Sequence, residues 1–152
     1  TAEVRDAFVK AFSVATTPDS IQRICGAIMN ITKNEEGKKL FATEAIRDAL
    51  LKAFSIATTD DSIQRVCGAI MNITSNDEAK KLFATTAIRD ALLKAFSVAT
   101  TAESIRWVCG AIWNITVDDK GQKLFAIEAI RDAFLNAHIL LAPVVTTGCI
   151  TG

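Results

Sequence analysis

The side chains that could act as nucleophiles, acids or bases are few and isolated. His138 is the one histidine in the chain, and it has no catalytic partner in any recognisable motif. The sequence contains no Gly-rich phosphate loop, no Cys-x-x-Cys pair and no His-Glu-x-x-His site. We therefore predict no catalytic residue, no metal site and no cofactor, and we expect that the chain is not an enzyme.

The cysteines are better explained by packing than by reactivity. Cys25, Cys67 and Cys109 recur every 42 residues among Ile and Val, as small buried apolar residues do. Neighbouring helices lie roughly 8–10 Å apart, whereas a disulfide needs Cα atoms within about 7 Å. The pattern therefore predicts free thiols and a reducing compartment. Cys149 lies in the C-terminal tail and receives no role.

The whole chain is organised by this 42-residue period. Four landmarks return at that spacing: Arg-Asp, Cys-Gly-Ala-Ile, Asn-Ile-Thr and Lys-Leu-Phe-Ala. They define one array over residues 1–137, with units at about 5–46, 47–88 and 89–130 and a partial unit at 131–137. Residues 138–152 form a divergent apolar tail, a possible cap or self-association segment. The two residues of each Arg-Asp pair are adjacent, so we expect them to diverge on a helix and to make separate contacts.

Charge and hydropathy reduce the number of partner classes that the sequence is compatible with. The 17 basic and 17 acidic residues give a formal net charge of +0, unlike the basic excess of a nucleic-acid binder. No apolar run approaches the ~18 residues of a membrane span. We therefore expect neither nucleic acid nor membrane as a partner. A cytoplasmic location is expected, with the nucleus as the other compatible compartment.

Each repeat is predicted to contain three helices, which makes the fold class all-α. In the second copy Asn76 can cap a short first helix that ends near Phe83. A second helix is expected from about Ala87 to Val98. The third helix of each repeat begins after a Thr cap, at Thr17, Thr59 or Thr101, and Pro18 suits the first position of such a helix.

The third helix has two distinct sides. At 100° per residue, one side holds the apolar residues Ile63, Val66, Cys67, Ile70 and Ile73. The other side holds Arg65, Gly68, Asn72 and Ser75, flanked by Gln64 and Met71. A mid-helix Gly costs up to about 1 kcal/mol relative to Ala. Gly68 therefore needs either a packing neighbour or a closely approaching ligand.

The pattern Cys-Gly-Ala-Ile-Met-Asn-Ile-Thr resembles the third helix of armadillo repeats, the family of β-catenin, plakophilins and importin-α. The resemblance covers the chain to about residue 137, and the period lies in the ~40–47-residue range of such repeats. It implies a right-handed α-solenoid of about three repeats with partial terminal repeats. It also implies that the third helices line a concave groove, in which Asn30, Asn72 and Asn114 bind the backbone of an extended peptide.

Two departures from the family pattern bear on the ligand. Gly26, Gly68 and Gly110 occupy the position of the importin-α Trp, and Arg23 and Arg65 stand where acidic residues would be. A basic nuclear-import signal is therefore not the expected ligand. The third copy carries Trp107 and Trp113, and Trp is often an interface anchor. Trp113 has an alternative role, packing between neighbouring third helices.

The predicted groove is therefore lined by polar, aromatic and small residues, and it should suit an extended, acidic or aromatic peptide. The groove residues are Arg23, Gly26, Met29, Asn30, Arg65, Gly68, Met71, Asn72, Trp107, Gly110, Trp113 and Asn114.

Two function classes remain open. The first is a scaffold that binds a protein or peptide in this groove. The second is a structural or self-assembling array, natural or designed, whose groove has no dedicated ligand. Neither end carries a polar capping repeat: Val4, Phe8 and Phe12 begin the array, and an apolar tail ends it. Either the tail covers the last repeat or chains join through their ends, and we expect a homo-oligomer.

Overall fold

The computed structural model describes residues 1–127, Asp132 and Leu135, and this part of the chain is entirely helical, with no strand. The predicted all-α class is therefore confirmed. The helices are α1 (Ala2–Val14), α2 (Pro18–Ile31), α3 (Glu35–Phe41), α4 (Glu44–Ile56), α5 (Asp60–Ile73), α6 (Asp77–Phe83), α7 (Thr86–Val98), α8 (Ala102–Ile115) and α9 (Asp119–Phe125).

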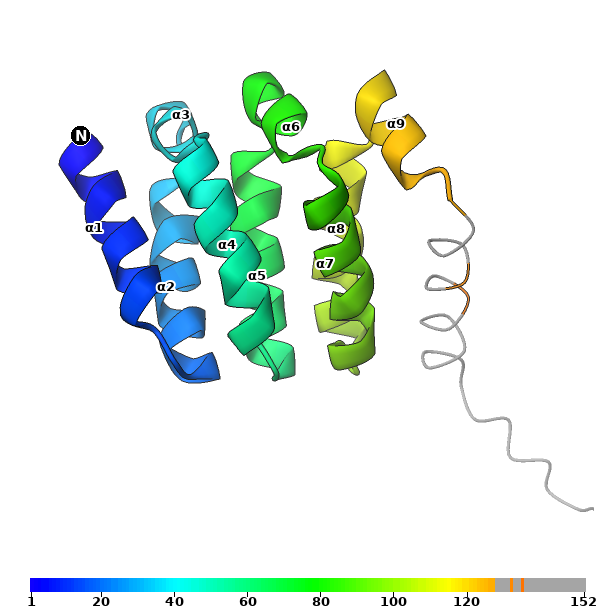
Figure 1. The fold of residues 1–152 in the computed structure, drawn as a ribbon, viewed down its shortest axis with the longest axis horizontal. Coiled ribbons are helices and arrows are strands. Elements are labelled where there is room, and N and C mark those ends of the chain that lie inside the picture. Colours follow the sequence, from blue (N-terminus) through cyan, green and yellow to red (C-terminus); the bar gives the residue numbers. More distant parts are fainter. Residues whose placement is uncertain (128–131, 133–134, 136–152) are drawn as a thin grey trace, which may run out of the picture.

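The helices form two layers and a row of short helices (Figure 1). The third helices of the repeats, α2, α5 and α8, pack side by side in that order, and these are the most extensive contacts between helices. The second helices, α1, α4 and α7, form the other layer, while α3, α6 and α9 lie along one end. We call the exposed side of α2, α5 and α8 the third-helix face.

Helix starts follow the predicted caps. Each third helix begins after a Thr whose hydroxyl accepts a hydrogen bond from the backbone N–H of a Ser three residues later, and that Ser hydroxyl is bonded back to the Thr. Pro18 occupies the first position of α2, as expected. Asn76 caps α6, and α7 begins at Thr86, one residue before the predicted start.

The core lies between the two layers. The five apolar residues assigned to the inner side of the third helix of the second repeat, from Ile63 to Ile73, are all buried. Cys25 and Cys67 are buried as predicted, whereas Cys109 is only half-buried. All three of these thiols are free, so no disulfide joins them across neighbouring repeats.

The expectation for the Arg-Asp pairs was wrong. In each described pair the Arg side chain turns along the helix and its guanidinium meets the next residue's carboxylate: Arg5–Asp6, Arg47–Asp48 and Arg89–Asp90 are each 2.8 Å apart. The length of the Arg side chain overcomes the divergence of adjacent Cβ atoms. The partial repeat at 131–137, apart from Asp132 and Leu135, and the tail at 138–152 with His138 and Cys149 lie outside the described residues.

Candidate functional site

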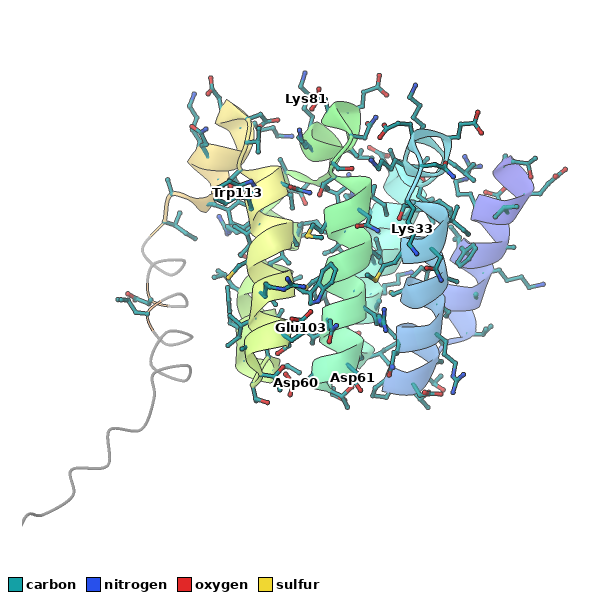
Figure 2. The ribbon with its side chains drawn as sticks, turned by 180° about the vertical axis from the view of Figure 1, so that it is seen from behind. Lys33, Asp60, Asp61, Lys81, Glu103 and Trp113 are labelled. Carbon is teal, nitrogen blue, oxygen red and sulfur yellow. The ribbon has the colours of Figure 1, made fainter. Side chains whose placement is uncertain are left out.

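The twelve residues predicted to line the groove all lie on α2, α5 and α8. Figure 2 shows the third-helix face turned toward the viewer. Arg23, Asn30 and Trp113 are exposed, and Gly68 is buried. Those of intermediate exposure are Gly26, Met29, Arg65, Met71, Asn72, Trp107, Gly110 and Asn114. Eleven of the twelve are therefore at least partly accessible, and Gly68 is the exception that needs a structural explanation.

Gly68 is buried because neighbours from both sides cover it. A Cβ atom at Gly68 would lie 2.7 Å from the Met29 thioether and 3.3 Å from the Trp107 ring. Met71 covers Gly110 in the same way, with its sulfur 2.6 Å from a Cβ placed there. The close approach that these two glycines permit is therefore made by side chains of the neighbouring third helices and not by a ligand. Gly26 remains open, because a Cβ added there would meet no atom within 4 Å.

The asparagines connect successive third helices. Asn72 Nδ2 donates a hydrogen bond to the Met29 carbonyl at 3.1 Å, and Asn114 Nδ2 donates one to the Met71 carbonyl at 2.7 Å. Each acceptor is one of the last four carbonyls of its helix, which lack a backbone N–H partner within the helix. Each also accepts a longer bond of 3.4 Å from a Thr hydroxyl, that of Thr32 or Thr74. One N–H and the Oδ1 of each amide remain available. The Asn30 side chain has no hydrogen-bond partner among the described residues.

Trp107 is held in place by its own helix. Its indole N–H donates to Glu103 Oε1 at 2.7 Å, and Arg106 donates to the same oxygen at 2.9 Å. The Arg106 guanidinium also lies 5.5 Å from the centre of the Trp107 ring. An exposed carboxylate therefore fixes an aromatic ring beside Gly68, in the middle of the third-helix face.

Trp113 does not pack between the third helices that the structure describes. Its side chain is 74% exposed. Met29 and Met71, which hold the equivalent positions, have a following helix to cover, whereas the described chain places no such helix beside α8. Trp113 instead lines a hollow of about 400 Å³ with the apolar side chains Cys109, Ile112 and Phe125.

The groove arginines differ in availability. Arg23 Nε is 3.0 Å from Asp19 Oδ2, one turn earlier on α2, so its charge is already paired. Arg65 makes no ion pair with any described residue and is half-buried. Arg65 is therefore the arginine of this face that retains an unpaired charge.

A polar pocket at the C-terminal ends of the third helices was missed by sequence reasoning. It has a volume of about 310 Å³ and is lined by Thr32, Lys33, Lys38, Met71, Asn72, Ser75 and Asn114. Lys33 was the one clue to this pocket in the sequence, because it breaks the repeat: the same position holds Ser75 in the second copy and Val117 in the third.

Asp60 makes a contact between repeats that the sequence did not reveal. Its carboxylate accepts hydrogen bonds from the backbone N–H of Thr100 at 2.8 Å and of Thr101 at 3.2 Å, and from the Ser104 hydroxyl. Partial burial alone would raise the pKa of Asp60. The hydrogen bonds, led by that from Ser104, outweigh this effect and hold the pKa well below its usual range. The equivalent residues in the other two copies are Pro18 and Ala102, so the 42-residue repeat gave no indication of this contact.

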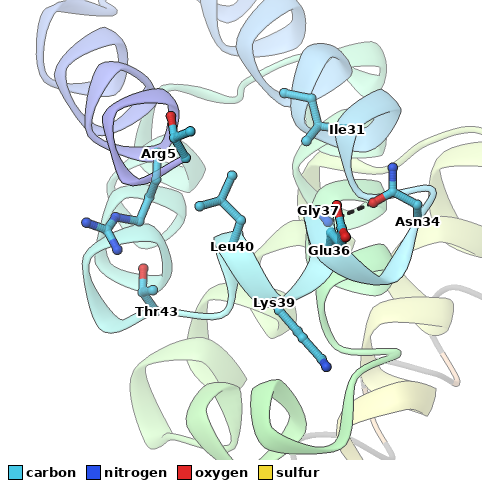
Figure 3. A pocket seen from close by; sticks show the side chains of 9 residues that line it. Arg5, Ile31, Asn34, Glu36, Gly37, Lys39, Leu40 and Thr43 are labelled. Atoms are coloured by element: carbon cyan, nitrogen blue, oxygen red, sulfur yellow. Dashed lines mark hydrogen bonds between the residues drawn. The ribbon is translucent and has the colours of Figure 1, made fainter.

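The remaining features offer little chemistry. Burial raises the pKa of the Cys25 and Cys67 thiols far above the ordinary value, which suppresses the thiolate. Within the described residues no group of His, Cys, Asp and Glu is placed to hold a metal ion. The hollow between α1 and α3 in Figure 3 contains Arg5, which is already paired with Asp6, and Asn34, which caps α3.

Comparisons with protein-family models, curated proteins and solved structures find no match to this chain. No helix in residues 1–127 is both long and apolar enough to cross a membrane.

Proposed function

We propose that the chain is a right-handed armadillo-like solenoid that binds an extended segment of another protein along its third-helix face. The 42-residue period, the three helices per repeat and the side-by-side packing of α2, α5 and α8 support this arrangement. In the proposal the third-helix face is the concave groove. The protein acts by binding, without catalysis, and in the cytoplasm or nucleus.

The observation that carries the proposal is the fixed orientation of Trp107, whose ring lies against Gly68 on α5, the helix that also carries an unpaired cation. Glu103 and Arg106 hold the indole ring before any ligand arrives, so little conformational entropy is lost when a ligand contacts it. Arg65 holds the equivalent position on α5 and has no ionic partner among the residues described. An aromatic ring held in place and an available guanidinium on the same face are typical of binding hot spots.

The asparagines add repeated hydrogen-bonding groups. Asn72 and Asn114 each use one N–H to join two helices and keep an N–H and an Oδ1 that a peptide backbone can pair with. Neighbouring helices lie roughly 8–10 Å apart, and an extended chain advances about 3.3 Å per residue. Successive repeats would thus contact the peptide at intervals of two to three peptide residues.

The alternative is an array that associates with itself. The exposed Trp113 and the hollow that it shares with Ile112 and Phe125 form an apolar surface at the α8–α9 end of the described chain. Light scattering over a range of micromolar concentrations tests this alternative. A mass that rises with concentration, and that returns to one chain in Trp113→Glu, would support a homo-oligomer.

Peptide binding is tested by selection from a random peptide library displayed on phage, followed by fluorescence anisotropy with synthetic peptides. Arg65→Ala and Asn30→Ala should each weaken binding several-fold, because each removes a polar group that is available to a ligand. Neither side chain makes a hydrogen bond or ion pair with a described residue, so polar contacts within the fold are left intact. Asn72 and Asn114 are unsuitable as sole probes, since their loss would also weaken the packing between helices. Lys94→Ala, an exposed change on α7, is the control. No peptide binding better than millimolar would refute the proposal.

A further inference from the structure

We infer that the pocket lined by Lys33, Lys38 and Asn72 receives one acidic side chain of the bound peptide and so sets where the peptide lies along the third-helix face. This inference rests on the proposed function and specifies its ligand. The pocket lies where the C-terminal end of α2 meets α3, beside the C-terminal end of α5.

The cation available in this pocket is Lys33. Lys33 is exposed and makes no ion pair with a described residue. Lys38, by contrast, has its Nζ 2.6 Å from Glu35 Oε1, and its side chain is only 18% exposed. The lining contains two lysines and no acidic residue. Once Glu35 has neutralised Lys38, one positive charge is left, which matches a single carboxylate.

Neutral groups in the same pocket complete the recognition of a carboxylate. The amide of Asn72 keeps one N–H after its bond to the Met29 carbonyl, and the amide of Asn114 keeps one after its bond to Met71. A carboxylate accepts several hydrogen bonds at once, and those from charged donors are the strongest. The amides and the Lys33 ammonium therefore offer an acidic side chain three donors within one pocket.

Charges on the rest of the face favour the same placement. Figure 2 shows Lys33 near one end of the third helices, with Asp60, Asp61 and Glu103 at the other. Asp61 is exposed and unpaired among the described residues, so it repels an acidic peptide side chain at its own end. At that end the charge of Arg65 is offset by that of Asp61, one turn earlier on α5, so the lysine end is the more favourable place for an acidic residue.

The charge of Lys33 does not recur at its position in the other described repeats, which is why this pocket can define a register. The repeat positions equivalent to Lys33 are Ser75 and Val117, neither of which carries a charge. Hydrogen bonds from the asparagines to a peptide would recur in every repeat. They would therefore allow the peptide to bind in positions shifted by one repeat. A single charged pocket removes that ambiguity.

The test uses the tightest peptide from the library selection, labelled with fluorescein and amidated at its C terminus so that every carboxylate is a side chain. Each Asp or Glu is replaced in turn by Asn or Gln, and affinity is measured by anisotropy with the full chain, Lys33→Gln and Lys81→Gln. One acidic replacement should weaken binding to the full chain about three- to tenfold but should have little effect on Lys33→Gln, because the two changes remove the same interaction. Lys81 is also an exposed lysine without an ionic partner among the described residues, but it lies on α6 outside the pocket, so Lys81→Gln should behave like the full chain.

A charge exchange makes the test independent of folding. Lys33→Glu should lose affinity for the selected peptide and regain it when the critical acidic residue is replaced by Lys. If peptides bind but every acidic replacement acts equally on the full chain and on Lys33→Gln, the inference is wrong and the proposed function stands. If no peptide binds, both are wrong.

Discussion

The side-chain amide of Asn72 donates its hydrogen bond to the backbone carbonyl of Met29, which lies 43 residues earlier in the chain. The Met29 carbonyl is in the last turn of α2, where no backbone N–H of the helix pairs with it, and the Thr32 hydroxyl donates only a longer bond to it at 3.4 Å. Asn72 therefore caps the end of the preceding third helix, and the Asn114–Met71 bond repeats this arrangement at the next junction. The asparagines that were predicted to bind a peptide therefore hold neighbouring repeats together.

The first prediction separates this capping role from ligand binding. Asn72→Ala should lower the free energy of unfolding by about 0.5–1.5 kcal/mol, the usual contribution of one hydrogen bond. Asn30→Ala is the matched control and should leave it nearly unchanged, because the Asn30 side chain bonds to no described residue. Urea denaturation followed by circular dichroism measures both. Equal effects of the two substitutions would show that the bond to Met29 contributes nothing.

The second prediction concerns two glycines at equivalent repeat positions. Gly26→Ala should stabilise the chain by up to about 1 kcal/mol, since Ala is the better helix former and the site is open. Gly68→Ala should gain less or lose stability, because Met29 and the Trp107 ring occupy the space of the new methyl group. Thermal denaturation of the two variants decides the matter, and a larger gain at Gly68 than at Gly26 would contradict the packing described.

The third prediction follows from the low pKa of Asp60. Asp60→Asn should destabilise the chain by about 1–3 kcal/mol at pH 7, because the charged acceptor of the hydrogen bonds from Thr100, Thr101 and Ser104 becomes a neutral amide with a single accepting oxygen. The folded pKa lies below the unfolded value of about 3.9. The stabilisation by the carboxylate is therefore complete above that value and is lost as the pH falls toward the folded pKa.

Urea denaturation at neutral and acidic pH measures this effect. The difference between the original chain and Asp60→Asn should shrink as the pH falls below about 4. Asp61→Asn is the control: Asp61 lies in the same first turn of α5 and has no partner among the described residues. It should cost only about 0.3–1 kcal/mol through the helix dipole. A difference for Asp60→Asn that stays constant with pH would contradict the assignment.

The sequence predicted which side of each third helix is buried, but it missed several contacts that side chains make between helices. The 100° periodicity placed Val66 and Cys67 in the core correctly, because burial on one side of a helix follows directly from its geometry. It placed Gly68 on the open side and could not show that Met29 and Trp107 reach over it, because that depends on how closely α2, α5 and α8 approach one another. Asp60 has no counterpart in the other repeats, so its bonds to the next repeat left no periodic trace.

The fourth prediction concerns the orientation of Trp107. Trp113→Phe leaves Trp107 as the one fluorescent indole, and its half-buried ring should be quenched by acrylamide less readily than the exposed Trp113. Adding Glu103→Ala removes the acceptor of the indole N–H and the partner of Arg106. The ring should then move more freely, so that quenching increases. Peptide affinity should fall a few-fold, because the ring must now be ordered when the ligand binds.

Asp19→Ala in the same Trp113→Phe background is the control, because it breaks a comparable exposed pair, Asp19–Arg23, on α2 and does not touch Trp107. It should leave both the emission and the quenching unchanged. If Glu103→Ala also leaves the quenching unchanged, Trp107 is held by its packing beside Gly68 alone. The carboxylate would then have no part in preparing the third-helix face for a ligand.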